Sequence, residues 1–384
     1  MTTRRAYLDW NATAPLLPAA REAMLAALDA GGNASSVHAE GRAARRLVDA
    51  ARRDVAALVG GDAANVVFTS GATEAASTLL QPCWRMGRAP VRIARAYVCA
   101  ADHPCTLGGG RFGAEQVSVI GIDGNGLIDI ESLERQLSAH DVEAGLALVV
   151  MHAANNETGV VQPFETVGRM AKAHGAVVAF DAVQAAGRVS LDVGAGYADF
   201  LFLSSHKLGG PQGAGAIVGA GGVLMPEPLV RGGGQERGHR AGTENVAAIA
   251  GFGTAAREAL AQLPRMDRVA ALRDRFEAAI LETVADAVIF GREAPRLSNT
   301  TFFAIPGMKA ETAQIAFDLA GIALSAGSAC SSGKVGPSHV LKAMGHGESA
   351  GALRVSIGPA TEEAELAAFT EVLAGLAGRR KAAA

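Results

Sequence analysis

The sequence is poor in cysteine and in net charge, and each shortage excludes a class of protein. Its four cysteines, Cys83, Cys99, Cys105 and Cys330, include no C-x-x-C pair, which argues against a disulfide framework and paired-cysteine metal sites. The chain has 35 lysines and arginines and 38 aspartates and glutamates, so its net charge is −3. It therefore lacks the basic excess that attracts nucleic acid or anionic lipid. We therefore expect neither nucleic acid nor a membrane as a partner.

Long apolar runs are also absent. The most apolar segment, residues 146–154, contains His152 and is well short of the roughly 20 residues that a membrane helix needs. Residues 1–10 include no apolar stretch of the length that a signal peptide requires. These absences predict a cytoplasmic protein.

The chain does have length and apolar residues in quantity. Its 384 residues, of which 49% are hydrophobic and 19% charged, can form about two to three domains with sizeable cores. The 47 glycines fall in short clusters without a fixed period, which excludes collagen-like and solenoid repeats. We expect a folded chain of more than one domain.

Short apolar runs that alternate with amphipathic segments predict an α/β sheet. Residues 37–59 have the apolar spacing of a helix, and residues 165–174 form a second helical stretch. The apolar runs that we interpret as strands are 66–68, 97–99, 117–120, 146–150, 177–180 and 200–203. Because these runs are apolar on both faces, a mostly parallel sheet covered by helices is favoured.

The pattern changes after about residue 250, where strands become fewer. A long helical stretch, three strand-like segments and a closing helix follow, at 254–285, 299–305, 322–325, 353–357 and after 361. This order predicts a smaller α+β domain. We expect an N-terminal segment that joins the small domain, a large domain and the small C-terminal domain, at 1–15, 16–255 and 256–384.

Polar residues directly after the strands are candidates for chemistry, because ligands of parallel sheets bind beyond the carboxyl ends of strands. Ser70-Gly71-Ala72-Thr73-Glu74 opens a helix whose free amides suit a phosphate; the alternative is an ordinary turn capped by Ser70 or Thr73. His103, in Asp102-His103-Pro104, is by itself more typical of a packed or capping histidine than of a catalyst. In residues 152–159, buried amides and a carboxylate need either a ligand or a turn network.

Two later strand runs end in charged residues. Asp181, with Gln184 three residues on, would pair with a cation such as a protonated pyridine nitrogen. Lys207 follows a buried run, where desolvation favours the neutral amine that forms a Schiff base. A phosphate cradle, a histidine to stack on a ring, a carboxylate and this lysine are together what pyridoxal phosphate requires.

On these residues the chain resembles the cysteine desulfurases, a group of class V aminotransferases within the fold-type-I pyridoxal-phosphate enzymes. The resemblance runs from Tyr7-Leu8-Asp9 to about Gly358, and Ser325-Ala326-Gly327-Ser328-Ala329-Cys330 is its most diagnostic stretch. It implies an α/β fold: a mostly parallel central sheet covered by helices, with a smaller α+β C-terminal domain. The loop that contains this stretch also resembles the loop of the long-loop cysteine desulfurases, the group that supplies sulfur to iron–sulfur cluster assembly.

The resemblance also implies a role for each matching position. Lys207 would hold the cofactor as a Schiff base, Asp181 its ring nitrogen and Gln184 its ring hydroxyl, while His103 would stack on the ring. The phosphate positions are matched by Ala72, Thr73, Ser204, His206 and Thr243. Because the family reaches the last of these across a dimer interface, a homodimer is implied.

For the substrate, the resemblance implies that Asn156 and Arg354 hold the carboxylate of L-cysteine, with Asn156 also beside the cofactor. Cys330 would take the sulfur as a persulfide, so the catalytic set would be Lys207, Cys330 and His103. The products would be L-alanine and sulfur for an acceptor protein such as an iron–sulfur scaffold. No metal ion is expected.

Other interpretations remain open at this point. A selenocysteine lyase or another class V enzyme would share the cofactor, and a non-catalytic sulfur-relay protein would share the fold. The retention of Lys207, Asp181 and Arg354 argues against the non-catalytic protein. A dinucleotide oxidoreductase is disfavoured because no G-x-G-x-x-G follows the first strand, and metal catalysis because the histidines are scattered.

Overall fold

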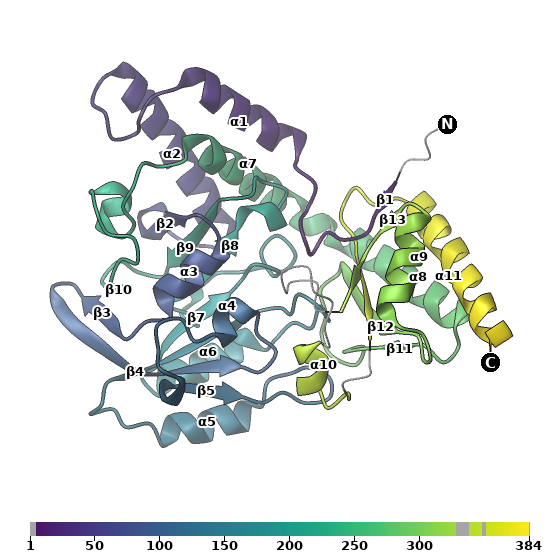
Figure 1. Cartoon of the computed structure of the whole chain (residues 1–384). Helices are drawn as coiled ribbons and strands as arrows, with labels where there is room; N and C mark the ends of the chain where they lie inside the picture. The colour runs from purple at the N-terminus through teal and green to yellow at the C-terminus, as the bar shows by residue number, and fades with distance from the viewer. Residues whose placement is uncertain (1–4, 328–337, 348–350, 384) are drawn as a thin grey trace.

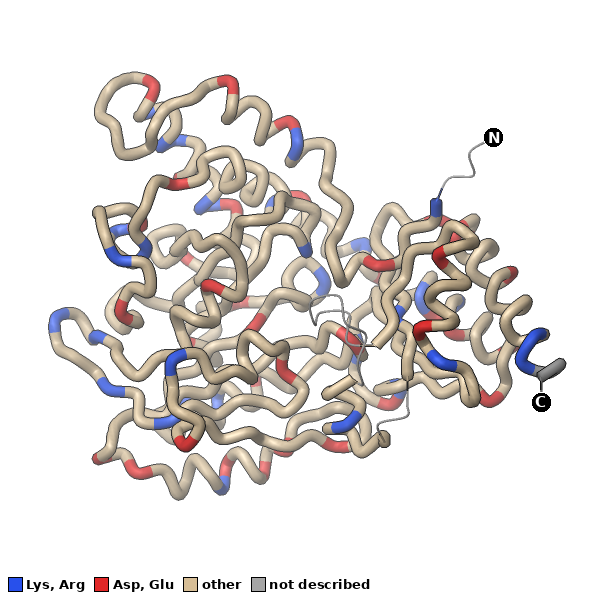
Figure 2. Tube along the Cα trace, viewed as in Figure 1, with Lys and Arg blue, Asp and Glu red and all other residues tan. Residues whose placement is uncertain are grey.

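The structure is a computed structural model that describes residues 5–327, 338–347 and 351–383. Figure 1 shows two groups of helices and strands: a larger one in purple to teal, and a smaller one in green to yellow that also receives the N-terminal strand. No helix in the described ranges is long and apolar enough to cross a membrane. In Figure 2, basic and acidic residues are interspersed along both groups.

The larger group is built on one sheet with the strand order β10-β3-β4-β6-β7-β8-β9-β2, in which β5 also pairs with β4. The pairs β4–β5, β4–β6, β6–β7 and β7–β8 are parallel, which confirms the predicted α/β class with a mostly parallel sheet. The strands are β2 (Val66–Thr69), β3 (Cys83–Met86), β4 (Ala89–Cys99), β5 (Val117–Ile120), β6 (Leu146–His152), β7 (Val177–Asp181), β8 (Phe200–Ser204), β9 (Gly215–Gly219) and β10 (Leu224–Pro226).

Helices cover both faces of this sheet, and two apolar clusters form the core on its two sides. In α2 the buried residues Ala44, Val48, Ala51 and Val55 recur every three or four positions, so one face of the helix packs inward. Every residue of β7 and β8 is buried, as expected of parallel strands covered on both faces. The helices are α1 (Pro18–Ala30), α2 (Ala39–Leu58), α3 (Ala72–Leu79), α4 (Pro104–Leu107), α5 (Ile130–Ser138), α6 (Phe164–Ala173) and α7 (Val246–Gln262).

The smaller group has its own apolar core, to which Ala6 and Leu8 of the N-terminal segment contribute. A four-stranded sheet, β11-β12-β15-β14, and the parallel pair β1–β13 lie beside helices α8, α9 and α11. The elements are β1 (Ala6–Tyr7), β11 (Val288–Ile289), β12 (Thr300–Ala304), β13 (Ile322–Ala323), β14 (Ser325–Ala326), β15 (Leu353–Ser356), α8 (Met266–Thr283), α9 (Ala310–Leu319), α10 (His339–Ala343) and α11 (Glu363–Ala383).

The packing refines the expected domain boundary. Helix α7 runs through residue 255 and packs against α1 and α2, and Pro264 follows its end in a single 3-10 turn, Leu263–Arg265. Since α8 packs with α11, the helical stretch predicted at 254–285 is two helices with different partners. We therefore propose that the large domain ends near residue 262, with α10 packed on the core of the large sheet.

Strands β3, β9 and β10 of the large sheet were not predicted from the sequence. Strand β9 lies between β8 and the edge strand β2 and pairs antiparallel with both, so it runs opposite to its two neighbours. Its sequence Gly215–Gly219 has only three apolar residues, Ala216, Ile217 and Val218, between two glycines, and glycine within a strand weakens the signal.

Candidate active site

A cavity of about 540 Å³ lies beyond the carboxyl ends of the parallel strands β6, β7 and β8. Nine of the twelve residues that the sequence analysis singled out line it. They are Ala72, Thr73, His103, Asn156, Asp181, Gln184, Ser204, His206 and Lys207. The sheet brings these residues together because parallel strands end at the same edge.

The start of α3 forms one end of the cavity. Gly71 is the N-cap residue and no side chain caps the helix, so the ordinary capped turn is not what forms here. The backbone amides at Ala72 and Thr73 therefore begin an uncapped helix beside the cavity, which is an arrangement that binds phosphate. Burial, and next the charge of Lys207, lowers the pKa of His206 to about 4, so its imidazole is neutral at pH 7.

Asp181 ends β7 at the bottom of the cavity. Its Oδ1 accepts a hydrogen bond from the backbone N–H of Val183 at 2.9 Å, while burial raises the pKa of the carboxyl group to about 6. Gln184 is buried nearby, where its Nε2 donates to the Asn11 carbonyl at 3.0 Å. A buried carboxyl group with a raised pKa is stabilised as an ion by a cation that enters the cavity.

Lys207 reaches the cavity from the turn after β8. Its Nζ lies 2.5 Å from the carbonyl oxygen of Asn11 and 2.8 Å from that of Ala12, and it donates to both. These two acceptors belong to the N-terminal segment, a feature that the strand pattern gave no reason to expect. They hold the amine at the cavity wall.

His103 has two structural roles: it caps the start of helix α4 and it lines the cavity. Its Nδ1 accepts from the backbone N–H of Cys105 at 3.2 Å and lies 3.0 Å from the Cys105 Sγ. When the imidazole is neutral, its proton is therefore on Nε2. Burial lowers the pKa of His103, with the charge of Lys207 as the second cause, and this favours the neutral form.

Cys105 also lines the cavity. Burial, and secondarily the charge of Asp181, raises the pKa of its thiol to about 12. Since the thiolate is the nucleophilic form of cysteine, Cys105 is poorly suited to attack sulfur at neutral pH.

The two asparagines after β6 have different surroundings. Asn155 Oδ1 accepts from the backbone N–H groups of Glu157 and Thr158, each at 2.9 Å, and its Nδ2 donates to the Ala101 carbonyl. Asn155 thus forms the turn network that the sequence analysis considered as an alternative to a ligand. Asn156 instead faces the cavity.

Three of the singled-out residues are outside the cavity lining. Thr243 lines a smaller neighbouring cavity of about 210 Å³, which shares Ser70 and Gly213 with the first. Arg354 lies behind Asn156, to whose carbonyl its Nη1 donates at 2.9 Å, and its Nη2 contacts the Asp9 carboxylate at 2.7 Å. Cys330 lies outside the described residues.

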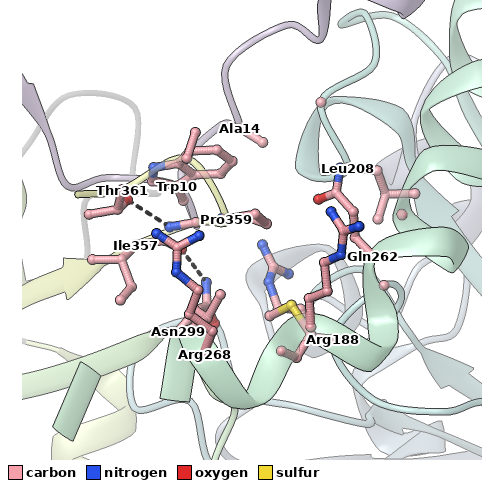
Figure 3. Close-up of a pocket in the computed structure, with 18 of the residues that line it drawn as sticks. Trp10, Ala14, Arg188, Leu208, Gln262, Arg268, Asn299, Ile357, Pro359 and Thr361 are labelled. Atoms are coloured by element: carbon pink, nitrogen blue, oxygen red, sulfur yellow. Dashed lines mark hydrogen bonds between the residues drawn. The ribbon is translucent and has the colours of Figure 1, made fainter. Parts of the chain in front are cut away.

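A second large cavity, of about 560 Å³, also has Lys207 in its wall. Trp10, Arg188, Arg268 and Pro359 line it (Figure 3), together with residues of both cores such as Ala186 and Met266. Arg188 donates to the backbone and side-chain oxygens of Gln184, at 2.8 and 3.0 Å. No local pattern in the sequence predicts this cavity, because its residues come from six separate segments.

Comparison with known proteins identifies the family. The family model described as aminotransferase class-V matches residues 6–369. The chain belongs to the class V aminotransferases. It is 41% identical over 377 residues to a cysteine desulfurase of Cereibacter sphaeroides, and this alignment covers 96% of this chain and 95% of that protein. It is 36% identical over 388 residues to an IscS-like cysteine desulfurase of Mycobacterium tuberculosis, with 99% and 98% covered.

A solved structure agrees with this family. The NifS-like protein from Rickettsia africae superimposes with a TM-score of 0.86 at 30% identity, over 97% of this chain and 99% of that one. The resemblance and the fold-type-I architecture predicted from the sequence are thereby confirmed. Class V aminotransferases of the cysteine desulfurase group depend on pyridoxal phosphate. The donor set of the cavity fits that cofactor: uncapped helix amides, a buried carboxyl group with a raised pKa and a lysine amine.

Proposed function

We propose that this chain is a pyridoxal-phosphate-dependent cysteine desulfurase that converts L-cysteine to L-alanine and passes the sulfur to an acceptor protein. The convergence of Lys207, Asp181 and the uncapped start of α3 on one cavity carries this proposal. The full-length similarity to proteins named cysteine desulfurase supports it.

In the proposed site Ala72 and Thr73, with Ser204 and His206, would hold the cofactor phosphate. Asp181 would pair with the ring nitrogen, Gln184 would contact the ring hydroxyl and His103 would stack on the ring. When bound, pyridoxal phosphate supplies an electron sink that stabilises negative charge at the α-carbon of an amino acid. The protein contributes position, charge and the transfer of protons.

Lys207 is the residue that we assign to cofactor attachment and to the α-proton. Its Nζ takes the proton from the α-carbon of the substrate, a step that needs the neutral amine. Its hydrogen bonds to the carbonyl oxygens of Asn11 and Ala12 give that amine a fixed direction.

Arg354 and Asn156 are the proposed partners of the substrate carboxylate. The Arg354 guanidinium is buried, and its Nε has no hydrogen-bond partner among the described residues. Two other nitrogens of the group are anchored to Asp9, Ser325 and Asn156. A buried donor without a partner favours an anion, so a carboxylate beside Nε would satisfy it.

Cys330 is the proposed sulfur acceptor. As a thiolate it attacks the sulfur of L-cysteine; an S–S bond forms, the carbon–sulfur bond breaks and its electron pair stays with the carbon. Protonation of that carbon gives L-alanine, and Cys330 keeps the sulfur as a persulfide. An acceptor protein, of which an iron–sulfur scaffold is one type, then removes it.

We also propose a homodimer. Both carboxylate oxygens of Glu244 are buried and lack hydrogen bonds in the described part of the chain, with only Arg45 Nη1 at 3.8 Å. Glu244 follows Thr243 in the small cavity beside Ser70, where a second copy would supply the missing donors. Sedimentation equilibrium should therefore give twice the chain mass; a monomer at micromolar concentration would contradict this.

The experiment that tests the function compares two cysteines. The purified protein is mixed with pyridoxal phosphate, L-cysteine and a reductant, and alanine and sulfide are measured. Cys330→Ala should release neither, because it has no acceptor thiol, whereas Cys105→Ala should stay within about threefold of wild type, because its thiol is protonated.

Two outcomes would contradict the proposal. A fully active Cys330→Ala variant would exclude Cys330 as the acceptor. A wild-type protein that binds the cofactor but turns over L-selenocysteine and not L-cysteine would instead establish a selenocysteine lyase.

A further inference from the structure

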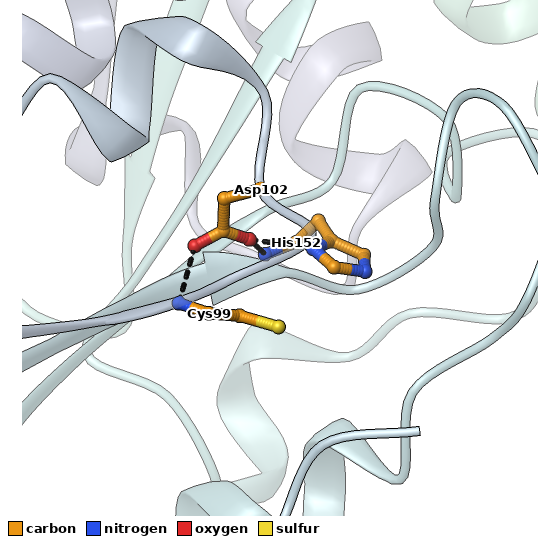
Figure 4. A group of neighbouring side chains, drawn as sticks. All are labelled: Cys99, Asp102 and His152. Atoms are coloured by element: carbon orange, nitrogen blue, oxygen red, sulfur yellow. Dashed lines mark hydrogen bonds and ion pairs between the residues drawn. The ribbon is translucent and has the colours of Figure 1, made fainter. Parts of the chain in front are cut away.

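A buried hydrogen-bonded chain lies next to Asp181 and has no part in the proposed reaction steps. Asp102 is fully buried, and its carboxylate accepts three N–H groups (Figure 4). Oδ2 accepts from the Cys99 backbone at 2.7 Å, and Oδ1 accepts from the His152 backbone at 2.8 Å and from His152 Nδ1 at 2.5 Å. An ionised carboxylate only accepts hydrogen bonds, so this set of donors suits Asp102 as an anion.

Gln162 decides which nitrogen of His152 carries the proton. Gln162 Oε1 accepts from the Ile128 backbone at 3.0 Å, and its Nε2 donates to the Gly126 carbonyl at 2.7 Å, so the amide cannot be turned round. The Nε2 also faces His152 Nε2 at 3.1 Å. His152 Nε2 must therefore accept, and the imidazole proton sits on Nδ1 and points to Asp102.

These groups do not form a metal site. Cys99 completes a set of three candidate ligands with Asp102 and His152. However, burial, and next the charge of Asp102, raises the pKa of the Cys99 thiol well above its usual value, and both imidazole nitrogens are already hydrogen bonded. The cluster is a hydrogen-bonded chain that runs from Gln162 through His152 to Asp102.

The sheet places this chain beside Asp181. His152 is the last residue of β6 and pairs in register with Asp181, the last residue of β7, so both side chains emerge on the same face and line the cavity. The charge of Asp102 acts with burial in raising the pKa of Asp181. Two carboxylates thus act on the same end of the cavity, and one cation there would be stabilised by both.

We propose that His152, oriented by Gln162 and Asp102, is a positioning residue for Asp181 that stabilises the protonated ring nitrogen of the cofactor. This inference rests on the proposed function, which places the ring beside Asp181. His152 donates to the Asp102 carboxylate, and it lines the cavity together with Asp181, with which it pairs in register.

The test replaces His152 with leucine, which has a similar volume but no donor, in the cofactor-loaded protein. The readout is the nuclear magnetic resonance shift of pyridoxal phosphate labelled with nitrogen-15 in the ring, together with the dissociation constant of the cofactor. His152→Leu should move the ring nitrogen toward the neutral pyridine shift and weaken cofactor binding about tenfold, the effect of one lost charge-assisted hydrogen bond. His152→Asn, which keeps an N–H donor for Asp102, should restore most of both.

Cys99→Ala is the matched control, because it changes the packing around Asp102 without removing a hydrogen bond donated to it. It should leave the ring-nitrogen shift at the wild-type value. Gln162→Leu provides a second, milder test, since it frees His152 Nε2 and should move the shift in the same direction. A wild-type shift and affinity in His152→Leu would overturn the inference. Failure of the wild-type protein to bind the cofactor would instead overturn the proposed function.

Discussion

Two cavities of nearly equal volume, about 540 and about 560 Å³, both have Lys207 in their walls, yet their linings differ in chemistry. The first gathers a buried carboxyl group, two imidazoles with lowered pKa values and the uncapped start of a helix. The second has apolar side chains and arginines, with no carboxylate among the described residues that line it. Volume alone therefore does not identify a site; the grouping of polar residues at the strand ends does.

The largest effect is expected from Lys207→Ala, at the lysine that both cavities share. Loss of the amine should lower alanine production by at least about a hundredfold, because both cofactor attachment and α-proton transfer are removed. Borohydride reduction followed by peptide mass spectrometry should place the cofactor on Lys207 in the wild type and nowhere in the variant.

Lys172→Ala is the control for this experiment. Lys172 is paired with Asp199, which directly precedes β8 and so lies at the opposite end of that strand from the cavity, and its loss should leave labelling unchanged. Labelling of Lys207→Ala at another lysine to the wild-type extent would contradict the assignment.

Asp181→Asn should have the next largest effect. It should lower the activity but raise the stability of the cofactor-free protein. The folded pKa of about 6 lies above the unfolded value near 3.8, so ionised Asp181 costs the cofactor-free protein stability as pH rises from about 4 to 6. At pH 7.5 that cost is about 3 kcal/mol, and the asparagine variant does not have it. Cofactor-free Asp181→Asn should melt above wild type at pH 7.5 and close to it at pH 4, while its activity falls.

The measurement for this prediction is thermal unfolding at the two pH values, before and after addition of pyridoxal phosphate. If the variant were less stable than wild type at pH 7.5, burial would not be the dominant influence on Asp181.

The smallest effect is expected in the second cavity. Arg268 is exposed and makes no ion pair with any described residue, so Arg268→Ala should leave kcat/KM for L-cysteine within about twofold of wild type. A tenfold or greater fall in kcat/KM in steady-state assays would show that the second cavity also takes part in the reaction. The two cavities would then not differ in function.

Most of the fold could be predicted because its signals are local. The runs at 146–150, 177–180 and 200–203 became β6, β7 and β8, since residues buried on both faces must be apolar along the whole strand. Strand β9 was missed because its apolar run, Ala216 to Val218, is only three residues long and is bounded by glycines, which are depleted in strands. The helical stretch at 254–285 was not divided, since the change of partner at Pro264 depends on packing.

The site was predicted to a similar extent, and for a similar reason. Asp181 ends a strand, and Lys207 and His103 each follow one, positions that the chain order alone reveals. The carbonyl groups of Asn11 and Ala12 that hold Lys207, and the Asp9 carboxylate that holds Arg354, come from a segment about 190 to 350 residues away. No spacing rule connects residues at that separation.

The sequence by itself determined which residues stand at the ends of the strands and, through the resemblance that they carry, the family and its cofactor. Only the tertiary structure decided the protonation and direction of those residues, because both depend on neighbours brought in by folding. Burial raises the pKa of Asp181, and Gln162 selects the tautomer of His152, through contacts between β6, β7 and distant loops. A residue type is a local property, whereas its electrostatic environment is a property of the whole fold.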